Sequence, residues 1–455
     1  MGLAVDGLIS GLNTTDLINS LMQLEALPQT QLKKKVSGSQ AMISALQGLN
    51  TKIASLATLA TDTAKPAALD LFKATSSSTT ATTAVRAGAS AGQMNVVVTT
   101  LAQAQVAVSA AVSVWPDDPP VLTVVASDGT HTQVTASTTS LADVAAAING
   151  ADAGVTAVSV STGDGNFRLQ FTSTETGADA AFEIHRGTSA QVTGGTSINV
   201  LTEPGAATIS VAQDAELTLW AGTTASQSIS SSTNTFADVL PGVDLTVTAV
   251  SADPITLTVA RDDKAISKVA ESFVSALNGV FALISTKSTV TDSTDTAGTP
   301  IVSAGPFTGD STVRGVNQQI LSAASMPVDG ISPSEIGISI TKTGTLEFDA
   351  TKFASALTDD PGKVEAIMQK LASRVADSAT QASDKYDGLI TTKITGQESM
   401  VKNFTTQIAE WDGRLEARRA NLERSYSAME VQLSALNSQS SWLTSQMSSL
   451  TAESA

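Results

Sequence analysis

The chain contains no cysteine, and aromatic residues make up only 4% of its 455 residues. Without cysteine, a disulfide scaffold and thiolate metal sites are excluded. No run of apolar residues reaches membrane-spanning length, and residues 1–27 lack the basic start and uninterrupted apolar core of a signal peptide. We therefore expect neither a membrane anchor nor a cleaved leader. An export route that reads an uncleaved N-terminus stays open.

Lysine is absent from the middle of the chain. Between residues 74 and 260 the basic residues apart from histidine are Arg86, Arg168 and Arg186, against fifteen acidic residues. This segment therefore carries about twelve of the seventeen net negative charges. Such a surface repels nucleic acid and anionic membranes. A solvated, exposed head is the simpler interpretation, and an acidic patch for a basic partner is the alternative.

What the chain does have is a long helical pattern at its C-terminus. Large apolar residues recur there in steps of three and four, which places them on one helix face: Val401, Phe404, Ile408, Trp411, Leu415, Leu422, Tyr426, Met429, Leu433, Leu436, Leu443, Met447 and Leu450. Arg418 and Ser440 also occupy this seam, and the doubled step of four from Arg418 to Tyr426 predicts a local unwinding of a supercoil. A helix of this kind needs partners in water.

The N-terminus carries a matching pattern. Asn13 is placed to cap a short helix that ends near Leu27, and Pro28 suits the first turn of a second helix. The second helix repeats apolar residues at heptad spacing: Leu32, Val36, Met42, Leu46, Leu49, Ile53, Leu56 and Ala60. Packing of both ends within one chain would account for residues 30–60 and 395–430. Residues 1–27 and 431–455 suit contacts with other chains better, because free termini are usually frayed until something docks on them.

Between these helical ends the pattern changes to alternation. Segments from Asn95 to Val259 read as strands separated by turn signals such as Asp128–Gly129 and Asp164–Gly165. One helix interrupts them, with Ser140 as its expected cap and Asn149–Gly150 at its end. Helical spacing returns from Ile266 onward, followed by an expected polar linker at 289–299 and a hairpin at 336–348.

The predicted fold class is an α+β multidomain protein: a helical coiled-coil stalk formed by both chain termini, with an inserted β-rich head of two small domains. We expect the following domains: terminal leg helices at 1–30 with 431–455; a helical stalk at 31–75 with 261–430; a β-rich head domain at 76–112 with 205–260; and an inserted α+β head domain at 113–204.

Several stretches resemble the flagellar filament cap protein family, also called flagellar hook-associated protein 2. They occur in the family's order and reach both ends: GLISGLNTTDLINSLMQLEALP (7–28), QDAELTLW (213–220), SSSTNTFADVLPGVDLTV (230–247), FVSALNGV (273–280), IGISITKTGTLEFD (336–349) and RLEARRANLERSYSAMEVQLSALNSQSSWL (414–443). The segment around SLADVAAAING (140–150) resembles the small repeat module of flagellins. Leu277 and Trp220–Ala221–Gly222 depart from the family pattern.

The resemblance implies a structural, non-enzymatic protein that is secreted through the flagellar export channel and acts outside the cell at the flagellum tip. There it would form a ring of identical chains that retains exported flagellin and promotes its folding and insertion. The implied partners are a second copy of the chain, flagellin, the hook–filament junction proteins, the export apparatus and an export chaperone at the C-terminus, with no nucleic acid, membrane insertion or cofactor. The expected interface residues are Leu8, Leu12, Leu17, Leu21, Leu24, Met429, Leu433, Leu436, Leu443, Met447 and Leu450.

The sequence offers no catalytic or metal site that outweighs a structural interpretation. His131 and His185 lie on separate expected strands and in no ligand spacing, and no G-x-S-x-G elbow is present. Two other hypotheses remain. A hook–filament junction protein or flagellin would also carry apolar terminal helices around a variable middle, whereas an adhesin would use the head domains to bind glycans or surfaces.

Overall fold

The two ends of the chain fold together in the computed structural model, which describes residues 13–163, 165–294 and 298–452. One unit combines residues 1–69 with 264–455, and the other spans Asp70–Asp263. The helices of the first unit are α1 (Thr14–Glu25), α2 (Leu27–Thr63), α5 (Asp263–Ser288), α6 (Ser311–Ser325), α7 (Ala350–Asp359), α8 (Pro361–Ser383) and α9 (Leu389–Ala452). Two hairpins join them, β17–β18 (Val290–Thr294, Pro300–Ala304) and β19–β20 (Ile338–Ile340, Leu346–Phe348).

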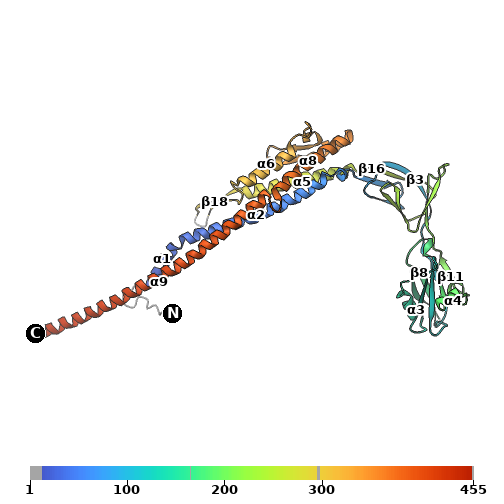
Figure 1. Cartoon of the computed structure of the whole chain (residues 1–455), viewed down its shortest axis with the longest axis horizontal. Helices are drawn as coiled ribbons and strands as arrows, with labels where there is room; N and C mark the ends of the chain where they lie inside the picture. The colour runs from blue at the N-terminus through green and yellow to red at the C-terminus, as the bar shows by residue number, and fades with distance from the viewer. Residues whose placement is uncertain (1–12, 164, 295–297, 453–455) are drawn as a thin grey trace. The chain divides into compact units, whose positions relative to one another are not determined.

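The helical unit is built around α2, which packs against both α8 and α9 (Figure 1). Its heptad residues are buried as predicted: Leu46, Leu49, Ile53, Leu56 and Ala60. The opposing face of α8 supplies Val364, Ile367, Leu371 and Val375, all fully or nearly fully buried. The expected helical stalk formed by both termini is therefore confirmed.

Helix α5 completes this core and is the exception to the expectation that no segment could span a membrane. Among the described residues it is the one helix that is long and apolar enough to cross a membrane, judged by length and composition alone. Its apolar residues Ile266, Phe273, Leu277 and Val280 are buried, however. Next to Leu277, the side-chain amide of Asn278 bonds the backbone N–H and C=O of Leu346 at 2.8 and 2.6 Å, which ties α5 to β20.

The second unit contains two sheets that share one core. A five-stranded sheet has the order β1-β16-β3-β12-β13, and a three-stranded sheet has the order β14-β15-β2. Val96, Leu217, Leu245 and Leu257 are among the residues that fill the space between them. The strands are β1 (Phe72–Ser76), β2 (Ala81–Val85), β3 (Gly92–Thr100), β12 (Ala215–Leu219), β13 (Gln227–Ser231), β14 (Thr235–Leu240), β15 (Val243–Val247) and β16 (Ile255–Arg261).

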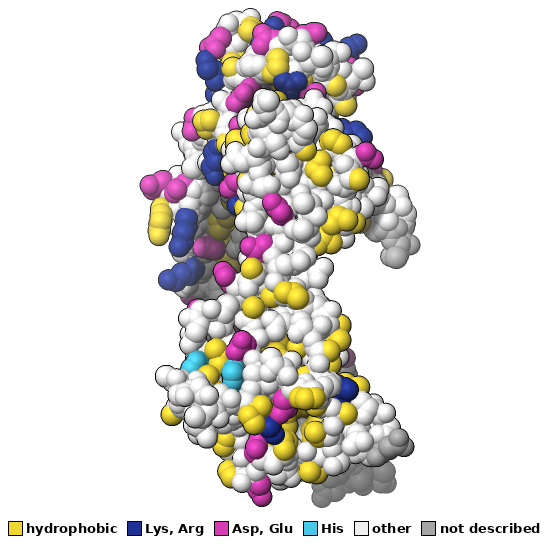
Figure 2. Space-filling view, turned by 90° about the vertical axis from the view of Figure 1, so that its right-hand side faces the viewer, with side chains coloured by type: hydrophobic (Ala, Val, Ile, Leu, Met, Phe, Trp, Pro, Cys, Tyr) yellow, Lys and Arg dark blue, Asp and Glu magenta, His cyan; other side chains and the backbone are white. Residues whose placement is uncertain are grey.

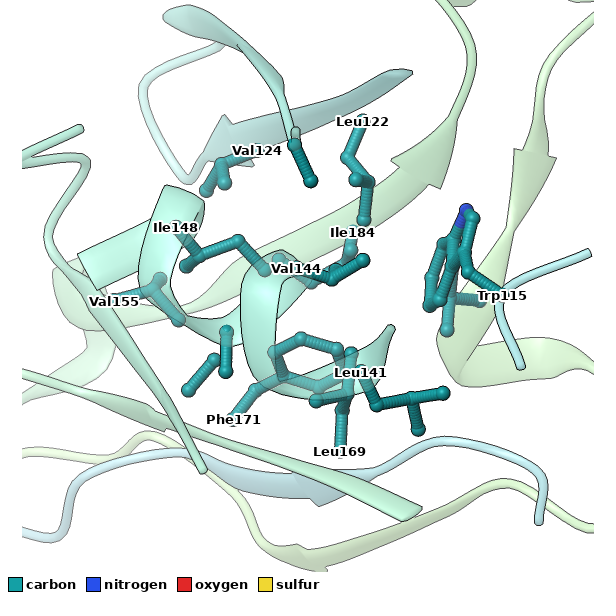
Figure 3. Packing of buried hydrophobic residues seen from close by; sticks show 14 of the residues in the cluster. Trp115, Leu122, Val124, Leu141, Val144, Ile148, Val155, Leu169, Phe171 and Ile184 are labelled. Carbon is teal, nitrogen blue, oxygen red and sulfur yellow. The ribbon is translucent and has the colours of Figure 1, made fainter. Parts of the chain in front are cut away.

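Two four-stranded sheets enclose a separate core around α3 (Leu141–Asn149) in the same unit. Figure 3 shows Leu141, Val144 and Ile148 of this helix packed among Phe171 and other side chains from both sheets. The sheet orders are β10-β9-β5-β6 and β11-β4-β8-β7. Their strands are β4 (Val106–Val108), β5 (Val121–Ala126), β6 (His131–Thr135), β7 (Val155–Gly163), β8 (Asn166–Ser173), β9 (Phe182–Arg186), β10 (Ile198–Asn199) and β11 (Ala207–Ser210), with the short helix α4 (Ser189–Thr193).

The structure differs from the sequence-based expectations at three points. Ser140 is the N-cap residue of α3, but its side chain makes no capping bond. The segment expected as a polar linker at 289–299 contains β17, which pairs with β18; both strands are exposed and carry no burial pattern that marks them in the sequence. Strands β4 and β11, which flank residues 113–204, pair within the sheet that contains β7 and β8, so the expected head boundaries stay proposals.

The surface reflects the uneven charge of the sequence. In Figure 2 few Lys and Arg side chains are visible around the two histidines, which both belong to the Asp70–Asp263 unit. Because this unit holds the acidic middle segment, long-range attraction to an anionic partner is disfavoured over this part of the surface.

Candidate functional site

The short helix α1 leaves a row of leucines exposed. Asn13 caps it through a bond from the Asp16 N–H to Oδ1 at 3.1 Å, as the sequence predicted. Ile18 is buried on the inner side, whereas Leu17, Leu21 and Leu24 are exposed, Leu24 by 66%. The predicted interface residues Leu8 and Leu12 lie outside the described part of the chain.

Polar contacts hold the N-terminal helices antiparallel to α9. The Gln29 side chain is buried and donates to the carboxylate of Asp412, and Glu25 pairs with Arg418 at 3.4 Å. Further along, the guanidinium of Arg419 donates to Asn19. Because the two segments run in opposite directions, α1 lies against the middle of α9. Helix α9 continues beyond α1 (Figure 1).

The accessibility of the α9 seam changes along its length. Its predicted apolar seam residues are half-buried from Val401 to Leu433, whereas Leu436, Leu443 and Met447 are exposed, Leu436 by 59%. Helix α9 has 64 residues, so at about 1.5 Å per residue it is a rod of roughly 95 Å. The side chain of Leu450 is outside the described residues. The structure thus leaves Leu17, Leu21, Leu24, Leu436, Leu443 and Met447 accessible and holds Met429 and Leu433 partly covered.

Two further large apolar side chains near the C-terminal end of α9 were not predicted from the sequence. Val431 and Trp442 are 69% and 62% exposed. At 100° per residue they lie roughly 100–160° around the helix from the seam residues. The sequence signal is weak, because a Val between Glu430 and Gln432 and a Trp after Ser441 lie outside the single apolar stripe. This end of α9 therefore offers apolar contacts on two sides and is suited to a groove that wraps around a helix.

The titratable groups of the head form no comparable site. His131 and His185 lie on β6 and β9, the strands that flank β5. The His185 imidazole is held between Ser197 Oγ at 3.0 Å and Glu183 Oε2 at 2.8 Å. Within the described ranges, no group of three or more His, Cys, Asp or Glu residues is placed to hold a metal ion.

Comparison with protein families shows matches at both ends and in the insertion. The model of the flagellar hook-associated protein 2 N-terminus matches residues 10–105, and that of its C-terminus matches residues 212–438. The flagellin hook IN motif matches residues 121–175, which confirms the predicted resemblance of this insertion to a flagellin module.

Curated relatives align over nearly the whole chain. The chain is 29% identical over 448 residues to flagellar hook-associated protein 2 of Escherichia coli K12, covering 93% of both chains. It is also 29% identical over 462 residues to B-type flagellar hook-associated protein 2 of Pseudomonas aeruginosa, covering 91% of both. Among solved structures, the D1-D2-D3 domains of the flagellar cap protein FliD from Escherichia coli align with a TM-score of 0.57 at 24% identity, over 78% of this chain and 99% of that one, which supports the fold.

Proposed function

Because the chain belongs to the flagellar hook-associated protein 2 family, we propose that it caps the tip of a bacterial flagellar filament outside the cell. The observation that carries this proposal is the end of α9, where Leu436, Trp442, Leu443 and Met447 are exposed on a helix too long for α1 to cover. These side chains would enter apolar grooves between the helical subunits of the filament, in the helix-in-groove mode.

The proposal includes a ring of identical chains. A ring requires a heterologous interface in which one surface of a chain contacts a different surface of the next, and in which the rotation closes. Such a ring would retain exported flagellin beneath it and give each subunit a space in which to fold and insert. The partners are accordingly a second copy of the chain, flagellin and the hook–filament junction proteins.

We further propose that the chain reaches the tip unfolded through the flagellar export channel, assisted by the export apparatus and by an export chaperone at its C-terminus. The absence of cysteine supports this route, since no disulfide can hold the chain in a folded or crosslinked form before passage. The role assigned here is structural and involves no catalysis.

The rival assignment to a hook–filament junction protein or flagellin is less well supported. Both long family matches, at 10–105 and 212–438, are to flagellar hook-associated protein 2, and the flagellin match is confined to residues 121–175 of the insertion. An adhesin role of the head stays a separate hypothesis, which binding of residues 70–263 to a glycan array would test.

A truncation tests the capping function. Removal of residues 431–455 takes away no buried side chain within 431–448, so the purified chain should keep its melting temperature. In a strain that lacks the native gene, the truncated chain should fail to support filament growth, and flagellin should appear in the medium as monomer. The full-length chain expressed from the same promoter is the control. Filaments of normal length from the truncated chain would refute the proposed role of α9.

A further inference from the structure

The β17–β18 hairpin projects from the helical unit without cover. It forms a two-stranded sheet of its own, and all ten of its strand residues are exposed. Val290, Ile301 and Val302 are the large apolar residues among them, and Val302 is 67% exposed. A lone two-stranded hairpin is marginally stable in water, and apolar side chains on it gain little until a partner covers them. The hairpin therefore exposes apolar side chains that would be stabilised by contact with a partner.

The register of the hairpin separates its two faces. Residues opposite each other in an antiparallel pair share a face, and successive residues alternate. Val290 pairs with Ala304 and Asp292 with Val302, so one face carries Val290, Val302 and Ala304 around the Asp292 carboxylate. The other face carries Thr291, Ser293 and Ser303 with Ile301. A partner for the apolar face needs an apolar or open surface with a cation at its centre.

The exposed side of α2 has these properties. Leu27, Lys34, Gly38 and Ala41 follow helical spacing and are all exposed, Leu27 by 53%. Within the described parts of the chain, Lys34 has neither an ion-pair nor a hydrogen-bond partner, and the same holds for the side chain of Asp292. A Cβ at Gly38 would meet nothing within 4 Å, so packing within the chain does not explain this glycine. Glycine inside a helix costs about 1 kcal/mol relative to alanine, and here it leaves backbone open to close approach.

Charge argues against pairing of either surface with itself. Two hairpins meeting about a two-fold axis would bring Asp292 next to Asp292, and two α2 faces would bring together the Lys33–Lys35 clusters. Like charges placed opposite one another are destabilising, whereas the hairpin and the α2 face are complementary. The two surfaces differ, lie on the same unit and so satisfy the requirement of a heterologous contact.

We propose that the β17–β18 hairpin of one copy docks its Val290–Asp292–Val302 face on the Leu27–Ala41 face of α2 in a second copy, with the Asp292 carboxylate against the Lys34 ammonium. This inference rests on the proposed ring and names one of its subunit contacts. The apolar side chains supply the buried area, and the rim ion pair sets orientation and register more than affinity.

The absence of native cysteine makes the contact directly testable. Asp292→Cys and Lys34→Cys are prepared as separate full-length variants and mixed in equal amounts under mild oxidation. A disulfide between them can only join two copies. It should form roughly tenfold faster than in a mixture of Asp292→Cys with Thr51→Cys, because docking raises the effective concentration of the correct thiol pair. Thr51 is an exposed residue of the same helix and serves as the matched position.

Charge reversal provides a second readout. Asp292→Lys should lower the yield of rings in negative-stain images, and Asp292→Lys combined with Lys34→Asp should restore it. All these residues are exposed, so circular dichroism should report unchanged folding.

Three results would overturn the contact. The first is an Asp292→Cys homodimer in excess of the mixed dimer, the second a mixed dimer no faster than the Thr51 control, and the third a charge swap without restoration. Filament growth supported by the unmodified chain is measured in parallel. Growth without the crosslink refutes the contact alone, whereas the crosslink without growth refutes the capping function alone.

Discussion

Leu436 shows at the scale of one residue how a helix face kept for another chain differs from a core face. It occupies the seam of α9 yet is 59% exposed, while Leu46, in the seam of α2, is fully buried. We expect Leu436→Asp to leave the melting temperature of the purified chain unchanged within error, because exposed substitutions usually alter stability by less than about 0.5 kcal/mol. In cells it should abolish filament growth, since an unpaired carboxylate in an apolar groove costs a few kcal/mol.

Two control variants sharpen this measurement. Leu46→Asp should destabilise the isolated chain by several kcal/mol because its carboxylate would be buried within the chain. Leu436→Met should preserve both stability and growth, since it keeps an apolar side chain of similar size. Unchanged filament growth with Leu436→Asp would show that this face of α9 contacts nothing.

The Asp310 carboxylate makes the stability of the helical unit depend on pH in the acid range. Its side chain is only 6% exposed, caps α6 through the Val313 N–H at 3.0 Å and pairs with Lys393 of α9 at 2.9 Å. Burial raises the pKa of this carboxyl, but the bonds from Val313 and Lys393 outweigh burial and lower its pKa below the ordinary value. A lowered folded-state pKa means that the stabilisation is present above the unfolded value, about 4, and is lost as the pH falls through the folded value.

Asp310→Asn should therefore destabilise the unit by about 1 kcal/mol at pH 7, because the amide can still cap α6 but cannot pair with Lys393 as a charge. The difference from the unmodified chain should begin to shrink as the pH falls below about 4, where the carboxyl of the unfolded chain protonates, and should continue to shrink until the native carboxyl protonates at its lower pKa. Urea unfolding followed at several pH values measures this. Asp377→Asn, at an exposed position of α8, is the control and should show a small, constant difference. A difference for Asp310→Asn that stayed constant down to pH 2.5 would contradict the assignment.

At the scale of elements, the sequence was most informative where burial and helical periodicity coincide. The α2 seam from Leu46 to Ala60 and the cap at Asn13 were predicted because apolar spacing and capping side chains are local signals. The β17–β18 hairpin was not, because strands exposed on both faces show no alternation between buried and solvated positions.

The candidate site was predictable only in part, for a related reason. Periodicity located the α9 stripe, but it could not show that α1 covers α9 no further than its middle, because that depends on the register of an antiparallel pairing between distant segments. Nor could it indicate Val431 and Trp442, which lie off the stripe and gain meaning only once the helix is known to be exposed on several sides. The sequence therefore indicates which helix face is apolar, and the structure is needed to show which part of that face is covered.

At the scale of the whole molecule, the β-rich unit is joined to the helical unit by two adjacent strands of chain. Phe72 of β1 pairs with Arg261 of β16, and the Asp262 N–H donates to the Leu71 carbonyl at 2.8 Å. The chain thus enters and leaves the Asp70–Asp263 unit at neighbouring points, and the named sheets of that unit are completed within it. An insertion with adjacent ends and its own cores is expected to fold independently.

We therefore expect residues 70–263 alone to be a folded, β-rich protein with a cooperative melting transition, because both of its cores, around Phe171 and around Leu217, are retained. The complementary chain, in which a short Gly/Ser linker joins Leu69 to Lys264, should keep the helical transition, since the short gap between Phe72 and Arg261 is easily bridged. Circular dichroism and calorimetry of both pieces and of the full chain measure this. If the units are independent, the two melting temperatures should recur in the full chain within a few degrees. A disordered 70–263 fragment, or a helical piece that no longer melts cooperatively, would show that each unit depends on the other for its fold.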